Sequence, residues 1–396
     1  MRISSAEMQR QAINSILDQQ AKINRLQKQM STGERFSTPA EDPIAAVSVQ
    51  DLDESLRTTK QYSDNAIVAK RRLSVEEIVL TEMGDKLQRV RELVVQADND
   101  TANNRDRQII AAEISLLRDE LVELANSKDS NGEYLFSGHQ SRTTPFTQDS
   151  TGMFIYNGDE GERFIQVGPT RQVSIGHSGK ESFVSIERVQ AAVSSANTGT
   201  GLITAGNVVK PNDYQRHDFT ITFGSASTFD VIDNTTGQIV LANQDYTSGE
   251  SIQFNGSQVT IEGQPALGDE FIVSPRANEN VFNAMSSLVN ILENAPTEQD
   301  ALAAFHENLN NELNNVDQSM EKILTVRTEV GGRLVSIDSQ EQVNDAYSFQ
   351  VEKSISELKD LDLIGAVSKF NLQLVALQSA QQSYLRIQGL SLFNQI

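Results

Sequence analysis

The sequence contains no cysteine and no tryptophan, and both absences limit what the protein can be. Without cysteine there are no disulfide bonds, no thiolate metal sites and no cysteine nucleophile. Aromatic residues make up 6% of the 396 residues and hydrophobic residues 38%, so the helix pattern must come mainly from aliphatic side chains. This composition favours long helices, and the length suits two or three domains.

Basic residues are also scarce. Lys and Arg total 33 against 54 Asp and Glu, which gives a net charge of -21. A surface of this charge repels phosphates, so we expect neither a nucleic acid nor a membrane as partner. The first thirty residues hold no apolar run longer than Ile16-Leu17. We therefore expect no cleavable secretory signal and no membrane-spanning helix there, and any export must use another route.

The motifs of catalysis and metal binding are incomplete. The four histidines do not have the spacing of a metal site, and we expect each to be a surface or turn residue: His139, His177, His217 and His306. His306-Glu307 begins like a zinc-protease helix, but Asn310 stands where the second histidine is required. We expect no catalytic site, no metal and no cofactor. Among enzymes, a glycosidase with two carboxylates remains the alternative.

Both ends of the chain show the three-and-four spacing of coiled-coil helices. In the first helix the spacing is set by Ile13, Ile16, Ile23 and Met30, with Gln20 and Gln27 completing it, and Gly33 ends the helix. In the last it is set by Leu363, Val367, Phe370, Leu374, Leu377 and Tyr384, interrupted by Gln381, Gln388 and Ser391.

The polar positions in these two stripes reduce the apolar surface that each helix can bury. We expect neither helix to be stable alone. Our hypothesis is that both are loose in the free subunit and fold against each other and against neighbouring subunits on assembly. An ordinary coiled coil within one chain is the alternative, because a stripe does not tell which chain supplies its partner.

Between these ends the sequence predicts two long helices and a third. One opens at Asp42-Pro43, where Asp42 caps the free amides and Pro43 suits the first helical position, and it runs to about Ala97. Its stripe contains Leu73, Glu76, Leu80, Met83, Leu87 and Val90. Another stripe follows from Ile110 to Leu124, and a further one runs from Val316 to Ile337.

The middle of the sequence has the two-residue period of strands. Short runs such as Phe154 and Tyr156 predict β-hairpins, and Phe219, Ile221 and Phe223 predict a strand. Asn255-Gly256 is a typical hairpin turn. Because helical spacing returns at Val281, the β-rich segment is expected to be an insertion in a helical protein.

We therefore predict a mainly α fold with a β insertion: a long antiparallel helical bundle or coiled coil of the N- and C-terminal segments, and a central β-rich domain. The expected terminal coiled-coil domain comprises residues 1–40 and 362–396. A helical-bundle core domain comprises 41–190 and 278–361, with a β-hairpin region at about 131–190. The inserted β-rich outer domain comprises 191–277.

Two motifs at opposite ends of the chain resemble the flagellin superfamily, and within it the family of hook-filament junction proteins. The first is Ser31-Thr32-Gly33-Glu34-Arg35-Phe36 with Pro39 through Ala46, and the second runs from Ser379 to Asn394 and includes Leu390-Ser391-Leu392-Phe393. Asn131 through Gly138 and Arg327 through Arg333 support the match. Asp42-Pro43 and the Leu390–Phe393 ending are more similar to junction proteins than to filament flagellins.

The resemblance implies a structural subunit of the bacterial flagellum that joins hook to filament, is secreted through the flagellar export apparatus and is no enzyme. It implies a homo-oligomeric ring, contacts with hook-associated protein 1 and flagellin, and an export chaperone at the C-terminal helix. The expected assembly interface consists of the terminal stripes with Leu390, Leu392 and Phe393. The alternatives are a filament flagellin and, in a different class, a secreted coiled-coil adhesin or adaptor.

Overall fold

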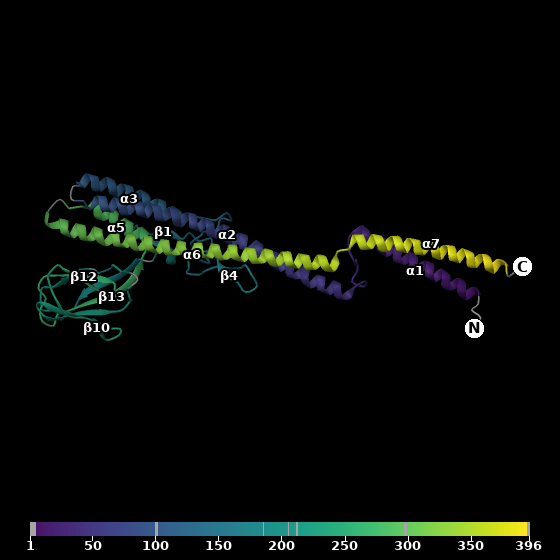
Figure 1. Ribbon diagram of the computed structural model, residues 1–396. Coiled ribbons are helices and arrows are strands. Elements are labelled where there is room, and N and C mark those ends of the chain that lie inside the picture. Colours follow the sequence, from purple (N-terminus) through teal and green to yellow (C-terminus); the bar gives the residue numbers. More distant parts are fainter. Residues whose placement is uncertain are drawn as a thin grey trace. The chain divides into compact units, whose positions relative to one another are not determined.

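The computed structural model describes residues 5–99, 102–184, 186–204, 206–210, 213–296 and 299–393. The chain forms two compact units. The terminal unit comprises Met1–Asn65, Val167–Pro169 and Ser339–Ile396, and the core unit comprises Ala66–Gln166 and Thr170–Asp338. Two long helices, α2 (Pro43–Ala97) and α6 (Gln299–Lys359), contribute residues to both units (Figure 1).

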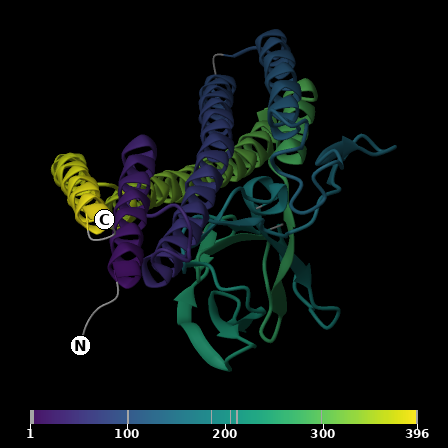
Figure 2. The same ribbon diagram turned by 90° about the vertical axis from the view of Figure 1, so that its right-hand side faces the viewer.

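In the terminal unit the two ends of the chain form a helix pair. α1 (Ser5–Thr32) packs against α7 (Leu363–Phe393), and the two lie side by side in both views (Figure 1, Figure 2). The pair is antiparallel, because the start of α1 and the end of α7 lie at the same end of it. The remainder of this unit contains the first part of α2 and the last part of α6, joined by a 2.7 Å hydrogen bond between Ser55 Oγ and Tyr347 Oη.

The helices of the core unit bury the stripes that the sequence predicts. In α2, Leu73, Leu80, Met83 and Leu87 are each 0% exposed. α3 (Asn104–Ala125) and α5 (Val281–Glu293) pack against each other, and their apolar stripes and that of α6 are buried as well. Ion pairs flank the apolar contacts on the outside, such as Arg91 to Asp317 at 2.8 Å between α2 and α6. The stripes of this unit are therefore satisfied within a single chain.

Two short hairpins and one short helix lie beside these helices in the core unit. β1 (Phe146–Gln148) pairs with β2 (Phe154–Tyr156), β3 (Phe164–Gln166) pairs with β4 (Gln172–Ser174), and α4 spans Gly179–Phe183. Aromatic rings connect the β1–β2 hairpin and α4 with α5, since the Phe146 ring lies 4.8 Å from that of Phe282 and 5.9 Å from that of Phe183. Such edge-on ring contacts supplement the burial of apolar surface.

The β-rich segment forms an antiparallel sheet. Its strands are β5 (Ile186–Val193), β6 (Leu202–Ile203), β7 (Asn207–Val208), β8 (Phe219–Ser225), β9 (Thr228–Asp233), β10 (Gln238–Asp245), β11 (Ser251–Phe254), β12 (Ser257–Glu262) and β13 (Glu270–Glu279). The order is β10-β9-β8-β13-β5-β7-β12-β11, with β6 paired to β12. β13 lies between β8 and β5, so the last strand of the segment holds two parts of the sheet together.

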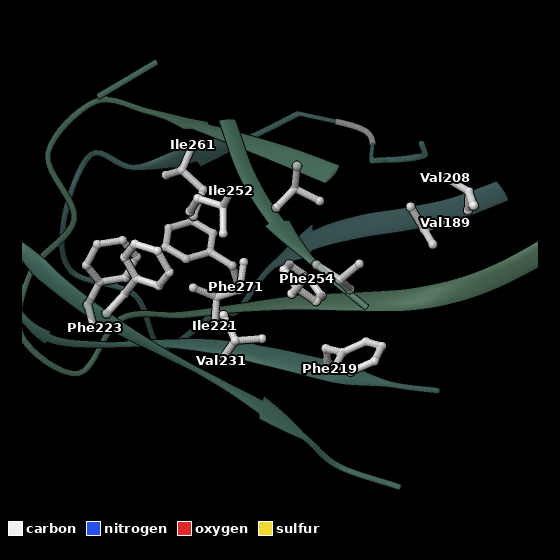
Figure 3. Close-up of a cluster of buried hydrophobic side chains, with 13 residues drawn as sticks. Val189, Val208, Phe219, Ile221, Phe223, Val231, Ile252, Phe254, Ile261 and Phe271 are labelled. Carbon is white, nitrogen blue, oxygen red and sulfur yellow. The ribbon is translucent and has the colours of Figure 1, made fainter. Parts of the chain in front are cut away.

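One face of this sheet forms its own hydrophobic core. Alternate residues of β8 and β9 point into it, among them Phe219, Ile221 and Val231, and β12 and β13 add Ile261 and Phe271 (Figure 3). The predicted Asn255-Gly256 turn joins β11 to β12, and both residues have positive φ angles of 47° and 75°. These left-handed conformations suit a two-residue hairpin turn, and Asn and Gly adopt them at low cost.

The predicted fold class is confirmed: the structure is mainly α, with paired terminal helices and a central antiparallel β-sheet. The two compact units do not follow the three predicted domain ranges. The terminal unit reaches Asn65 and begins again at Ser339, and the β-sheet belongs to the same unit as the bundle. The predicted limits at residues 40 and 362 lie instead close to the joint between the terminal helix pair and the helices α2 and α6.

Candidate assembly surface

The two chain segments that lead to the terminal helices are tied together at this joint. Leu361 donates its amide to the carbonyl of Gly33 at 2.8 Å, and the Arg35 amide donates to the carbonyl of Lys359 at 2.7 Å. A 3.0 Å ion pair between Lys359 and Glu34 lies beside them. Gly33 has a φ of +73°, a conformation that L side chains rarely adopt. The chain segments that follow α1 and precede α7 are thus hydrogen-bonded to each other where the helix pair joins the rest of the terminal unit.

The segment from Ser31 to Ala46 turns the chain from α1 into α2. Its apolar residues Phe36 and Ala45 are buried with Val49, against Ile355 and Leu358 of α6. α2 begins at Pro43, and the carboxylate of Asp42 accepts a hydrogen bond from the Ala45 amide at 3.1 Å. An oxygen in that position satisfies one of the free amides at a helix start. The first of the two motifs that carry the family resemblance therefore builds a turn of defined geometry.

The stripe of α1 is only partly covered by α7. Ile23 is 7% exposed and is buried, whereas Ile16 and Met30 are half-buried and Ile13 is 41% exposed. Gln20 and Gln27, the polar members of the stripe, are exposed to solvent. The contact between the two helices is therefore tightest around Ile23 and opens toward the chain terminus.

The stripe of α7 is covered to a similar degree. Phe370, Leu374, Leu377 and Tyr384 are half-buried, while Leu363 and Val367 are exposed. The residue of α7 with the least exposure is Ala366, at 4% among the described side chains of this helix. The side chains of Leu390, Leu392 and Phe393 lie outside the described residues, so their place in the expected interface stays a prediction.

α7 has a second apolar face, which the residues of the predicted stripe do not include. Ile364, Leu372, Val375 and Leu385 are between 61% and 86% exposed. At 100° per residue they lie on one side of the helix, turned away from Ala366, Phe370 and Leu377. Lys369 and Arg386 are the only charged residues in α7, and this shortage of charge was the sequence signal for a helix with more than one buried face. The pair thus presents a bare aliphatic surface.

The core unit contains buried charges that the sequence did not reveal as such. His177 was expected to be a surface or turn residue. It lies in the loop between β4 and α4, but its side chain is 0% exposed, so the expected surface position is wrong. Its Nδ1 lies 2.8 Å from Glu76 Oε1 and its Nε2 lies 3.2 Å from Glu329 Oε2. Burial opposes a charge on the imidazole, but the hydrogen bond and charge of Glu76 act the other way, and the pKa of His177 is raised.

This arrangement has a structural rather than a catalytic character. Each nitrogen of the His177 ring already faces a carboxylate, so the ring joins α2 to α6. Within the described ranges, no group of three His, Cys, Asp or Glu side chains could hold a metal ion. Among the helices of the described chain, none is long and apolar enough to cross a membrane.

Comparisons with known proteins agree with this architecture. Residues 3–141 match the bacterial flagellin N-terminal helical region. The flagellar hook-associated protein 3 of Salmonella typhimurium is 27% identical over 99% of both chains. Crystal structures of FlgL from Xanthomonas campestris and of the flagellar junction protein FlgL from Legionella pneumophila are 30% and 28% identical, each with a TM-score of 0.59. They cover 77% and 79% of this chain, and this chain covers 99% of each.

Long helices, a helix pair formed by the two chain ends, a β insertion and a matching N-terminal helical region together define a structural protein of the flagellin superfamily. Within that superfamily, the chain belongs to the family of flagellar hook-associated protein 3. The alternative of a filament flagellin has less support, since the match to hook-associated protein 3 runs along the whole chain.

Proposed function

We propose that this chain is a structural subunit of the bacterial flagellum that joins the hook to the filament and is incorporated through its α1–α7 pair. The observation that carries the proposal is the bare aliphatic face of α7. Burying one Leu or Ile side chain contributes about 1.5 to 3 kcal/mol, so four such residues represent a large driving force for association. A monomer gains nothing from that face.

The occupant of this face in the assembly is a terminal helix of a second copy of the chain. Both helices of the pair expose aliphatic side chains, since α1 also exposes Leu17 at 56% and Ile13 at 41%. A ring of identical subunits repeats the same contact from copy to copy. Hook-associated protein 1 on one side of the ring and flagellin on the other are the proposed neighbours.

Before assembly the same face needs protection in the cell. An exposed apolar helix face favours aggregation. A hydrophobic groove on a second protein commonly covers such a face. We therefore include an export chaperone that holds α7 among the proposed partners. The exposed fractions of Ile364 and Leu385, at 86% and 64%, support this choice.

The proposal is tested by placing charge on the bare face. The double variant Leu372→Glu, Val375→Glu should leave the thermal unfolding of the purified monomer unchanged, because both side chains are already exposed. In a strain that lacks the wild-type protein, the variant should produce bare hooks and release flagellin into the medium. Electron microscopy of the cells and flagellin quantification in the medium measure the two effects.

A matched control introduces the same two negative charges on a different surface of the protein. Leu267→Glu with Ile239→Glu alters two aliphatic residues of the β-sheet segment that are 74% and 60% exposed. These cells should carry attached filaments in normal number. Normal filament attachment by the α7 variant, with the protein present at wild-type level, would contradict the proposal.

A further inference from the structure

A small cavity lies inside the core unit where three loops meet α2. Its walls are formed by Arg72, Leu135, Gly138, Gly161, Arg163 and the stretch from Ile175 to His177. The volume open to the centre of a water-sized sphere is about 10 Å³. One water molecule requires about that much room, so the cavity can hold a single water and nothing larger.

Three buried polar atoms at or beside this space have no hydrogen-bond partner among the residues that the structure describes. They are Arg72 Nε, Arg163 Nη2 and Glu76 Oε2. Arg72 is 8% exposed and Glu76 is 1% exposed, so solvent does not reach them from outside. A buried polar atom without a partner costs about 1 to 3 kcal/mol, more if it is charged, and such atoms are rare in native proteins.

Other polar atoms of the same side chains are engaged in ion pairs and hydrogen bonds. Arg72 Nη1 contacts Asp129 at 2.5 Å and Arg163 Nη1 contacts Glu133 at 2.7 Å. Glu76 uses its Oε1 for His177. These contacts hold the side chains in place, so the three partnerless atoms cannot turn elsewhere without breaking an ion pair.

The position of Gly176 places two of these atoms around one point. A Cβ atom on Gly176 would lie 3.7 Å from Arg72 Nε and 3.8 Å from Glu76 Oε2. Other glycines are required where the loops approach, since a Cβ on Gly138 would stand 2.2 Å from Asp159 and one on Gly161 would stand 1.5 Å from His139. The loops therefore converge closely but leave a space opposite Gly176.

The chemistry of the lining selects the occupant. Two of the atoms are N–H donors and the third is a carboxylate acceptor, so the occupant must both accept and donate hydrogen bonds. An anion would meet the Glu76 carboxylate, and a cation would meet two guanidinium groups. Water accepts from two donors and donates to an acceptor in a single position.

We propose that this cavity is a binding site for one ordered water molecule that accepts hydrogen bonds from Arg72 Nε–H and Arg163 Nη2–H and donates one to Glu76 Oε2. The water ties the loops around Leu135, Gly161 and Gly176 to α2. It completes the hydrogen bonding of a charged cluster that would otherwise be incomplete at three atoms, next to Leu135 and Gly138 of the segment 131–138 that carries part of the family resemblance.

The substitution Gly176→Ala tests the proposal through the sign of its effect. The added methyl group meets no atom closer than 3.7 Å, so it fits sterically, but it occupies the place of the water. If water is bound, the variant leaves charged atoms unpaired and its thermal midpoint falls by several degrees. If the cavity is dry, the methyl group fills empty space and raises the midpoint, which would overturn the proposal.

A control and a direct measurement complete the experiment. Gly84→Ala, in α2 with no atom within 4 Å of its Cβ, should raise the midpoint slightly, as alanine does in a helix interior. In the wild-type protein, an NMR cross-relaxation signal between the Arg72 Nε proton and water should be present, and it should vanish in Gly176→Ala. Its absence from the wild-type protein would equally overturn the proposal.

Discussion

Helices α2 and α7 start from the same spacing of apolar residues and end in different states. In α2, Leu80, Met83 and Leu87 are 0% exposed, whereas in α7 Leu372 and Val375 are 66% and 61% exposed. Ion pairs join α2 to α3, as Lys86 to Glu120, and to α6, as Arg91 to Asp317, whereas among the described residues α7 packs mainly against α1. An apolar stripe therefore predicts that a helix packs against a partner. The number of neighbouring helices in the same chain decides how much of the stripe remains exposed for contact with other molecules.

Polar residues in the two sets of stripes differ in the same way. Glu76 interrupts the stripe of α2 and is buried, where it binds His177. Gln20, Gln27 and Gln381 interrupt the terminal stripes and are exposed. A polar residue in a stripe of the core unit is thus hydrogen-bonded to a partner within the chain. A polar residue in the terminal pair remains available to a neighbouring subunit or to water.

The largest expected difference comes from the same substitution in both helices. Leu80→Ala removes a fully buried side chain and should lower the free energy of unfolding by about 2 to 5 kcal/mol. Leu372→Ala should change it by less than about 0.5 kcal/mol. Chemical denaturation of the full chain as a monomer measures both. Equal losses in the two variants would show that α7 is covered within the chain and would break the comparison.

A partly buried carboxyl in α6, that of Glu312, adds a test that depends on pH. Burial, with a contribution from the nearby Glu279, raises the pKa of Glu312 to about 7. Since this pKa lies above the ordinary value of 4.5, the folded protein keeps a proton that the unfolded chain releases, and stability falls as the pH rises from about 4.5 to about 7.

Glu312→Gln should therefore stabilise the protein at pH 8 by on the order of 1 to 3 kcal/mol, because the amide resembles the protonated carboxyl. At pH 5 the gain should be much smaller. Denaturation curves at the two pH values measure the difference, and Glu293→Gln at the exposed end of α5 serves as control. A gain that is the same at both pH values would show that ionisation of Glu312 is not its cause.

The smallest expected effect concerns the start of α2 in the terminal unit. Asp42→Ala removes the hydrogen bond to the Ala45 amide and should cost about 1 kcal/mol, whereas Asp42→Asn keeps a capping oxygen and should cost much less. Hydrogen exchange at Ala45 should become about fivefold faster in the alanine variant alone. Equal exchange rates in both variants would mean that the cap does not stabilise this helix start.

Local signals predicted the elements of this fold well. The Asp42-Pro43 pair and the return of helical spacing at Val281 coincide with the starts of α2 and α5, and Asn255-Gly256 occupies the predicted turn. Such features depend on a few neighbouring residues, so the sequence contains the information directly. The prediction that His177 is a surface or turn residue missed its burial, because no local pattern shows that Glu76 and Glu329, 101 and 152 residues away, contact the same ring.

By itself the sequence determined where the helices, strands and turns of this protein lie, and which faces of the helices are apolar, because propensity, capping and periodicity act over a few residues. Only the tertiary structure decided which of those faces the chain covers. Burial depends on contacts between residues far apart in the sequence, so the buried charges around His177 and the bare side of α7 became visible only once the chain was folded.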